Sequence, residues 1–181
     1  ISKLNNNLKK LIFVAMNRRF FDSTIYLKKR LMKYSNKKKR VLEVYDCQNE
    51  RFFEKRKFHQ DVRKNLMYAN SIHLIDYFNI FCRGTISRIN VVKEKFKNVN
   101  FLFAILKFSS GDIGYYTCDL NYLTNWKVRL GLDHETWTFS PLETVLYKNI
   151  KNNNNKLTEF KTIYKDGFYN QINEFEKLLN G

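Results

Sequence analysis

Few side chains in this 181-residue sequence have the types and spacing that catalysis requires. The three histidines, His59, His73 and His134, are too far apart along the chain to predict a ligand cluster. Asp133-His134-Glu135 offers three possible metal ligands, but adjacent residues point in different directions and rarely converge on one atom. The sequence contains no P-loop, dinucleotide fingerprint or G-x-S-x-G elbow. We therefore expect no catalytic residue, no metal site and no cofactor.

The three cysteines, Cys47, Cys82 and Cys118, are an odd number and include no C-x-x-C pair. This spacing argues against a disulfide framework and against a cysteine-ligated zinc site, and it fits a reducing compartment. Arg83 follows Cys82 and could lower the pKa of its thiol, but the apolar run before it favours a buried strand cysteine.

Basic residues are the strongest chemical signal in the sequence. Lys and Arg number 33 against 17 Asp and Glu, giving a formal net charge of +16. Residues 1–66 hold 19 of the basic and 6 of the acidic residues, so this third carries a net charge of +13. Its three clusters, Lys28–Arg30, Lys37–Arg40 and Lys55–Lys57, repel one another unless a polyanion neutralises them. The pattern favours a nucleic-acid partner over a merely solvated basic tail.

Apolar residues recur at helical spacing between Leu4 and Tyr34, with basic residues among them, so we expect one or two amphipathic helices. This basic, acid-poor segment has the composition of a mitochondrial transit peptide, but we favour a retained helix that contacts RNA or protein. A helix lying on a membrane surface is the weaker alternative. No membrane span is predicted, since the longest apolar runs, such as Leu11–Met16, are far shorter than roughly 20 residues.

The centre of the chain is predicted to be β-rich. Val41–Tyr45 is a short strand-like segment, and Ser109–Asp112 is typical of a tight hairpin turn in which Gly111 takes a positive φ. Tyr115 and Tyr116 should then point to opposite faces of a strand. Four short strands, spaced by about 10 residues, indicate a small barrel or sandwich. They are expected within Ser71–Phe78, Cys82–Val92, Asn100–Phe108 and Ile113–Leu120.

After Asp133 the pattern changes. An irregular stretch is followed by the polar run Asn152–Asn155, which we expect to be a solvated linker. From Leu157 to Leu179 apolar residues return at helical spacing, interrupted near Gly167. This last segment predicts a terminal helix or helix pair.

Three central segments carry a resemblance to a known family. They are Gly84–Ile89 (GTISRI), Ala104–Asp112 (AILKFSSGD) and Tyr115-Tyr116. Their order and spacing resemble the N-terminal domain of the universal L-two protein of the large ribosomal subunit. In that family a G-T-V-x-R-I strand precedes an apolar A-L-V-x-Y strand and a D-G turn. Upstream, Ile72–Tyr77 resembles the family's I-I-D-F strand, and His59 lies about where its H-R-G-G-G-H-K motif begins.

The sequence departs from that family in three places. Gln60–Lys64 replaces the glycine-rich stretch after the first histidine, and Cys118-Asp119 stands where the family has Ala-Pro. The family's C-terminal SH3-like domain has no counterpart after Asp133. The resemblance therefore covers residues 59–130, and it suggests a separately encoded C-terminal half as a further partner.

The resemblance implies an oligonucleotide-binding fold, a five-stranded barrel that meets nucleic acid through one strand face and adjoining loops. It also implies that ribosomal RNA and neighbouring ribosomal proteins are the partners. The basic residues expected to contact RNA are Lys37, Lys38, Lys39, Arg40, Arg51, Arg56, Lys57, His59, Arg63, Lys64, Arg83, Arg88, Lys93, Lys95 and Lys97.

Together these observations predict an α+β protein with a small OB-fold-like β-barrel core, a basic helical N-terminal extension and a C-terminal helix. The expected divisions are a basic extension at 1–66, a barrel domain at 67–133, a linker at 134–156 and a helical segment at 157–181. We expect a structural, non-enzymatic constituent of the mitochondrial large ribosomal subunit in the mitochondrial matrix. An accessory subunit of a membrane-associated respiratory complex is the alternative. A small nucleic-acid enzyme is disfavoured because the sequence has no carboxylate cluster.

Overall fold

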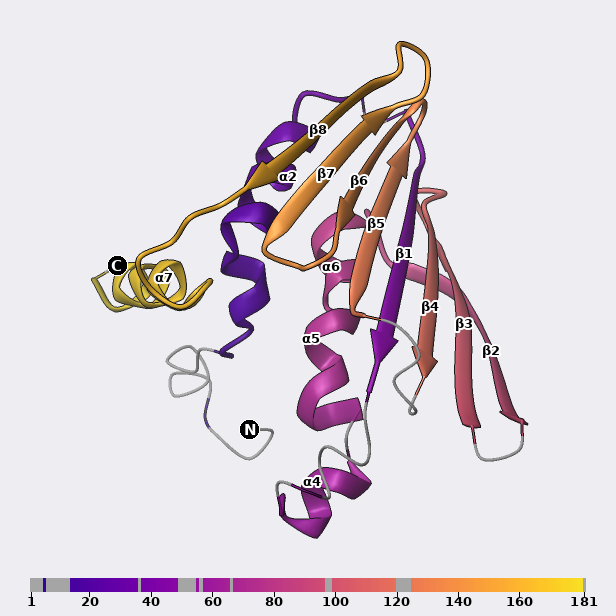
Figure 1. Ribbon diagram of the computed structural model, residues 1–181, viewed down its shortest axis with the longest axis vertical. Coiled ribbons are helices and arrows are strands. Elements are labelled where there is room, and N and C mark those ends of the chain that lie inside the picture. Colours follow the sequence, from indigo (N-terminus) through magenta and orange to yellow (C-terminus); the bar gives the residue numbers. More distant parts are fainter. Residues whose placement is uncertain are drawn as a thin grey trace.

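A mixed β-sheet of eight strands forms the centre of the protein (Figure 1). The computed structural model describes residue 5 and residues 14–35, 37–48, 55, 57–65, 67–96, 99–119 and 125–180. The strands are β1 (Arg40–Cys47), β2 (Ile86–Phe96), β3 (Val99–Phe108), β4 (Ile113–Asp119), β5 (Lys127–Leu132), β6 (Glu135–Phe139), β7 (Thr144–Asn149) and β8 (Asn154–Glu159). Their order in the sheet is β2-β3-β4-β1-β5-β6-β7-β8. β1 runs parallel to β4, and the other neighbouring pairs are antiparallel.

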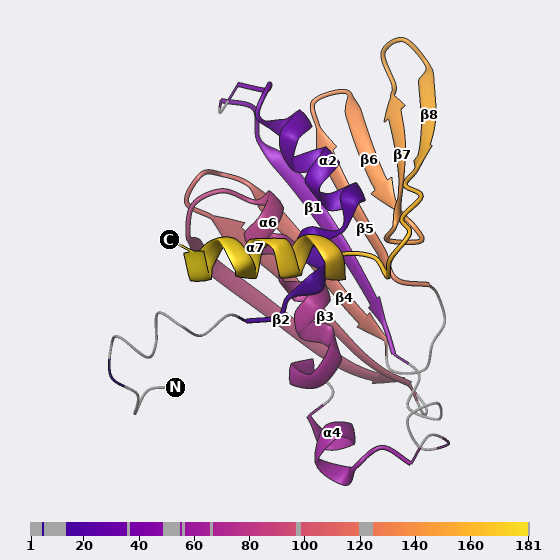
Figure 2. The ribbon, with the colours of Figure 1, turned by 90° about the vertical axis from the view of Figure 1, so that its left-hand side faces the viewer.

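Helices cover one face of this sheet. The helical elements are η1 (Asn17–Phe20), α2 (Asp22–Leu31), α4 (Gln60–Lys64), η2 (Met67–Ser71), α5 (Ile72–Ile75), α6 (Tyr77–Phe81) and α7 (Phe168–Asn180). Of these, α2, α5 and α6 lie against the sheet, and α7 packs on η1 (Figures 1 and 2). α4 lies at the end of the molecule towards which β1 points (Figure 1).

The covered face is apolar because strand residues alternate between the two faces. In β4, Gly114, Tyr116 and Cys118 are buried, and the residues between them are partly exposed. β5 repeats this alternation from Val128 to Leu132. Such a period of two is expected where one face of a sheet packs on a core and the other does not. The predicted opposite orientation of Tyr116 and its neighbour Tyr115 is confirmed.

The sequence accounts for the placement of α2. Its buried residues Ser23, Thr24, Leu27 and Leu31 fall on the side that faces the sheet. Asp22 lies in the first turn and three basic residues lie in the last, so the charges at both ends complement the helix dipole. This helix confirms part of the predicted N-terminal helical segment, whose earlier residues lie almost wholly outside the described ones.

The predicted closed barrel is wrong. β1, which was expected in an RNA-contacting extension, is inserted between β4 and β5, and β6 to β8 continue the sheet past Asp133. β2 and β8 are therefore the two edges of an open sheet. The strand predicted at Val41–Tyr45 is confirmed within β1, and the strands predicted around β2, β3 and β4 are also confirmed. Ser109–Asp112 forms the predicted turn, with Gly111 at a φ of 83°.

The segment Ser71–Phe78 is helical, although a strand was predicted. Its β-branched and aromatic residues favour a strand by propensity. However, Leu74, Tyr77, Phe78 and Phe81 recur at intervals of three and four residues, and all four are buried. Burial at helical spacing against the sheet outweighs the local propensity.

The C-terminal part also differs from the prediction. Asn152–Asn155, expected to be a linker, carries the chain from β7 into β8, with Asn153 in the left-handed region at a φ of 51°. A terminal helix is confirmed, but α7 begins only at Phe168, and Leu157 lies in β8.

One sheet draws strands from all four segments into which the sequence was divided. The division at residues 66, 133 and 156 stays a prediction. Within the described part of the chain, no helix combines the length and the apolar character needed to cross a membrane.

Candidate functional site

The carboxyl ends of β1 and β4 meet at one edge of the sheet because these two strands are parallel. The last residues in register are Cys47 and Asp119. The backbone N–H of Gln48 donates to the carbonyl oxygen of Asp119 at 2.7 Å and so joins the two strand ends. In open α/β sheets, ligands bind outside the carboxyl ends of the strands, where parallel neighbours part.

Buried polar side chains gather at this edge. The carboxylate of Asp46 is fully buried and accepts a hydrogen bond from the Tyr116 hydroxyl at 2.7 Å and another from the Gln48 amide. The same amide group donates to the Ser71 hydroxyl at 3.4 Å, and Asn70 donates to the Gln48 amide oxygen at 2.9 Å. Burial, reinforced by the Asp46 carboxylate, raises the pKa of Tyr116, so this phenol remains a donor. The network fixes β1, β4 and η2 relative to one another.

Arg18 of η1 lies beside this network with little access to solvent. Its side chain is 8% exposed, and its Nη1 has no hydrogen-bond partner in the structure. The guanidinium carbon lies 4.4 Å from the centre of the Trp126 ring, and the indole N–H of Trp126 donates to the Cys47 carbonyl at 2.8 Å. Burial lowers the pKa of Arg18, although nearby acidic groups partly oppose the effect. The neighbouring Arg19 differs because it forms a two-bond ion pair with Asp76, at 2.5 Å for each bond.

His73 of α5 completes the group. It is half-buried, and its Nδ1 is buried without a hydrogen-bond partner. Burial, followed by the positive charge of Arg18, lowers the pKa of His73, while Asp76 acts in the opposite direction. The imidazole is therefore neutral at pH 7 and able to accept a proton.

The arrangement combines a neutral imidazole with a buried guanidinium at the edge of a rigid polar network. Perturbed ionisable groups on adjoining elements are a recognised sign of a functional site. Chemically, His73 can accept a proton from a bound compound, and Arg18 can bind an anionic or strongly polar oxygen.

Among the residues that the structure describes, no three His, Cys, Asp or Glu side chains are placed to hold a metal ion. The three cysteines are buried, and none of them forms a disulfide. Burial raises the pKa of Cys82 and of Cys118 to about 12 each, so neither is a thiolate nucleophile at neutral pH. Cys82 is buried as predicted, but it follows the end of α6 and does not lie in a strand.

No family model and no curated protein matches this sequence. Solved structures match it by fold. The fold is shared with dehydrogenases. A dehydrogenase from Chromobacterium violaceum matches with a TM-score of 0.67 at 14% identity, over 92% of this chain and 53% of that chain. UDP-N-acetylglucosamine 3-dehydrogenase from Acidithiobacillus ferrooxidans matches with a TM-score of 0.64 at 15% identity, over 93% of this chain and 51% of that chain.

A Gfo/Idh/MocA family oxidoreductase from Vibrio cholerae also matches, with a TM-score of 0.62 at 12% identity, over 93% of this chain and 52% of that chain. The chain thus spans about half the length of the structures that it resembles. At these identities the likeness shows the fold.

This fold contradicts the resemblance to the ribosomal L-two family. It also contradicts the predicted ribosomal function, the respiratory alternative and the expectation of a non-enzymatic protein, because the matched structures are oxidoreductases. The quoted motifs Gly84–Ile89 and Ala104–Asp112 correspond to β2, β3 and their turns. A hairpin of this kind occurs in many antiparallel sheets, so its pattern fixes the local pairing and not the rest of the fold.

The described residues do not form a dinucleotide site, although the matched fold is that of dehydrogenases. Such sites place a glycine-rich turn between a strand of a parallel sheet and a helix. β1 and β4 are the one parallel pair in the described sheet, and the stretches after them, Gln48–Lys57 and Leu120–Arg129, contain no glycine. No step through such a cofactor is derived from this chain.

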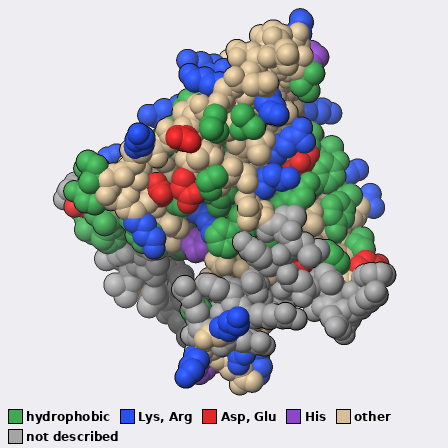
Figure 3. Space-filling view, in the orientation of Figure 1, with side chains coloured by type: hydrophobic (Ala, Val, Ile, Leu, Met, Phe, Trp, Pro, Cys, Tyr) green, Lys and Arg blue, Asp and Glu red, His purple; other side chains and the backbone are tan. Residues whose placement is uncertain are grey.

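The residues predicted to contact RNA do not form one surface. Lys37, Lys38 and Lys39 are exposed between α2 and β1, whereas Arg63 and Lys64 are exposed on α4 at the other end of the molecule (Figure 1). Figure 3 likewise shows Lys and Arg side chains both over the upper strands and around α4. Lys57 and His59 lie beside α4, and Arg88, Lys93 and Lys95 lie on β2, where the structure does not describe the side chain of Lys95. Arg51, Arg56 and Lys97 lie outside the described residues.

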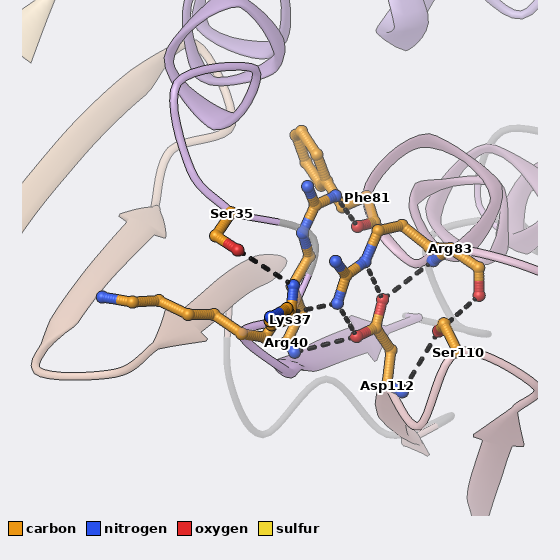
Figure 4. A network of polar contacts seen from close by, with 8 residues as sticks. Ser35, Lys37, Arg40, Phe81, Arg83, Ser110 and Asp112 are labelled. Atoms are coloured by element: carbon orange, nitrogen blue, oxygen red, sulfur yellow. Dashed lines mark hydrogen bonds and ion pairs between the residues drawn. The ribbon is translucent and has the colours of Figure 1, made fainter.

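Arg40 and Arg83 support the fold directly (Figure 4). The fully buried Asp112 accepts hydrogen bonds from the backbone N–H groups of both arginines, at 2.9 Å each, and from the Arg83 guanidinium at 2.6 and 3.0 Å. Arg40 donates to the carbonyl oxygen of Phe81 at 2.7 Å. RNA binding by the fifteen residues stays a prediction, as do the predicted partners and the mitochondrial location.

Only weak sequence signals point to the residues that the structure brings together. The spacing of the histidines predicts no ligand cluster, and in the structure they lie on different elements: His59 before α4, His73 in α5 and His134 between β5 and β6. Arg18 and Asp46 were not candidates, and Tyr116 was expected only to lie on a strand, facing away from Tyr115. One signal for a buried polar site is present in β1. Asp46 continues the buried face of the strand after Leu42 and Val44, at a position where alternation predicts an apolar residue.

Proposed function

We propose that this chain forms the substrate-binding part of a dehydrogenase-type oxidoreductase, and that its substrate is a hydroxylated, sugar-like compound. The carrying observation is that Arg18 and His73 each have a buried nitrogen without a hydrogen-bond partner, and that Arg18 lies against Trp126, which is bonded to the end of β1. The fold likeness supports the reaction class, and the match to a dehydrogenase of a nucleotide sugar supports the substrate class.

His73 is assigned the role of proton acceptor. Oxidation of a hydroxyl group releases a proton, and a neutral imidazole can take it up at a free nitrogen. Its burial and the charge of Arg18 both favour the neutral form, which is the form this role requires. The network of Asp46, Gln48 and Tyr116 holds the site edge in place while the substrate binds.

The binding site for the hydride acceptor is assigned to a unit outside these residues, because the two strand ends lack a glycine-rich turn. The proposal therefore makes a specific claim about the chain alone. It should bind a polyol without binding a nicotinamide dinucleotide.

Titration calorimetry with myo-inositol, glucose and NADH tests this claim. We expect one of the two polyols to bind the wild-type chain, and His73→Gln to weaken that binding about 10-fold through the loss of a hydrogen bond to the reacting group. The matched control His134→Gln, which changes a histidine in the β5–β6 turn, should bind as the wild type does. Binding of NADH without binding of either polyol would contradict the proposal.

A further inference from the structure

We infer that Arg18 binds an anionic oxygen group of the substrate, a carboxylate or a phosphate. The inference rests on the proposed function, since it names the class of compound that the same site would accept. Its basis is the burial of Arg18 together with the absence of a hydrogen-bond partner at its Nη1.

Arg30 is partly buried, and its Nε has no hydrogen-bond partner either. Arg18 is the one described arginine that is buried as a whole. Its Nη1 has no partner, and no ion pair involving it occurs among the residues that the structure describes. Arg19 and Arg83, by contrast, each form a two-bond pair with the carboxylates of Asp76 and Asp112, which are 4% and 0% exposed. A buried cation without a paired anion is unfavourable, so a bound anion would stabilise Arg18 in this position.

The nearest acidic network is already occupied. Asp46 attracts Arg18 electrostatically, but one of its carboxylate oxygens accepts from Tyr116 and the other from Gln48. Glu143 also acts on Arg18 only through its charge. Neither carboxylate is hydrogen-bonded to Nη1, so this donor remains available to a further acceptor.

Trp126 holds the guanidinium in a defined plane. The indole covers one face of the Arg18 head group at 4.4 Å, and it is itself held through its N–H by the Cys47 carbonyl. The unpartnered Nη1 is the donor that an oxyanion would use, because guanidinium N–H groups bind carboxylate and phosphate oxygens. The geometry resembles a preorganised anion-binding group more than a structural ion pair.

The position of His73 connects this group to the reacting end of the substrate. Arg18 and His73 are close enough for the arginine to act on the imidazole electrostatically. An anionic group held by Arg18 would therefore place the remainder of a small hydroxylated compound within electrostatic reach of His73. Sugar acids and sugar phosphates fit this description.

NMR of the three histidine side chains in the purified full chain provides the test. Gluconate supplies a carboxylate, glucose 6-phosphate supplies a phosphate, and glucose is the neutral probe. We expect saturable shifts of the His73 imidazole signals with one of the two anions, at an affinity about 10-fold or more above that for glucose. His59 and His134 are internal controls, since their side chains are 77% and 59% exposed elsewhere. Parallel shifts of all three histidines would overturn the inference, because they would report unspecific charge effects.

Arg18→Met removes the charge and keeps the length of the side chain. We expect it to lose the anion-induced shift of His73, with a melting temperature equal to or above that of the wild type because an unpaired buried charge is gone. Arg88→Met, at an exposed position on β2, is the matched control and should respond as the wild type does. An unchanged anion response in Arg18→Met would overturn the inference.

If Arg18→Met does not fold, Arg18→Lys decides. It keeps the charge without the fork, and we expect weaker but saturable anion binding; wild-type affinity in this variant would overturn the role of the guanidinium. The neutral probe, glucose, separates the two proposals. If glucose shifts the His73 signals and neither anion binds more tightly than glucose, the inference about Arg18 is overturned and the proposed function is not. If none of the three probes shifts these signals, the proposed function is contradicted as well.

Discussion

Asp112 is the residue on which the most hydrogen bonds of the described structure converge. Its carboxylate joins the start of β1, the end of α6 and the β3–β4 turn through Arg40 and Arg83 (Figure 4). Burial alone would raise its pKa, but the hydrogen bonds from the Arg83 side chain and from both backbone N–H groups hold the pKa below its usual value. A charged Asp112 is thus the form that the fold requires.

Replacing Asp112 with Asn should lower the free energy of unfolding by about 3 kcal/mol, because the Arg83 guanidinium loses its buried partner. Urea denaturation at pH 7 measures this change. The control Asp133→Asn removes a half-exposed carboxylate that pairs with Lys38, and it should change stability little. Since the folded pKa of Asp112 is lowered, its contribution is present above pH 4 and is lost as the pH falls through the folded pKa. Equal losses in both variants would contradict this account.

The lowered pKa of His73 predicts how the stability of the protein depends on pH. The folded pKa of His73 lies below the value of about 6.5 for an exposed imidazole, so the unfolded chain binds the proton first as the pH falls. The stability that depends on a neutral His73 is therefore complete above pH 6.5 and is lost below it. Unfolding free energies measured from pH 8 to 5 should fall less steeply in His73→Gln than in the wild type and in His134→Gln. Identical slopes in all three proteins would show that His73 is not held neutral by the fold.

At the scale of elements, the contact between β4 and α6 depends on a missing side chain. A Cβ on Gly114 would lie 2.5 Å from Cε1 of Phe78, which is too close for any real contact. Gly114→Ala should therefore destabilise the protein by about 2 kcal/mol through overpacking. Gly131→Ala in β5 is the matched control, since its Cβ would meet no atom closer than 3.8 Å. Urea denaturation of both variants checks the prediction, and a loss of the same size at Gly131 would assign the effect to strand glycines in general.

The attachment of α7 to η1 is a second close contact. A Cβ on Gly167 would lie 2.3 Å from the carbonyl oxygen of Asn17, and Gly167 has a φ of 76°. Nearby, Asn170 donates to the Phe20 carbonyl and to the Asp22 carboxylate at 3.0 Å each. Helix α7 packs on η1. Hydrophobic side chains gather at the side of the molecule where α7 lies (Figure 3).

Gly167→Ala should loosen α7 from η1 and disturb Arg18, which η1 carries. We expect faster amide hydrogen exchange throughout α7 and η1, with β5 and β6 unchanged. Asn170→Ala removes the two side-chain hydrogen bonds without changing the backbone, and it should show a smaller effect of the same kind. Exchange rates in α7 that match the wild type in both variants would mean that these contacts do not hold the helix.

At the scale of the whole molecule, the sequence predicts local structure better than the sheet. The hairpins of β2, β3 and β4 and the turn at Gly111 follow from alternation and turn chemistry between neighbours in the chain. The insertion of β1 between β4 and β5 pairs residues that are about 70 to 90 positions apart, and no local pattern encodes it. The helices between Met67 and Phe81 were missed because their stability comes from burial against that sheet.

The same reasoning applies to the site. Arg18, Asp46 and His73 lie on η1, β1 and α5, and they come together only when β1 takes its place beside β4. The high positive charge drew attention to exposed lysines, whereas the informative arginine is one that burial leaves without a carboxylate partner. A buried, unpartnered charge cannot be recognised before the fold is known.

Amide hydrogen exchange of the chain with and without gluconate tests most directly where the molecule binds its ligand. The account predicts slower exchange at the ends of β1 and β4, in η2 and α5, and around Arg18, with unchanged exchange in β2 and in the lysine-rich stretch Lys37–Lys39. Protection confined to β2 or to that stretch, with none at the joined ends of β1 and β4, would contradict it.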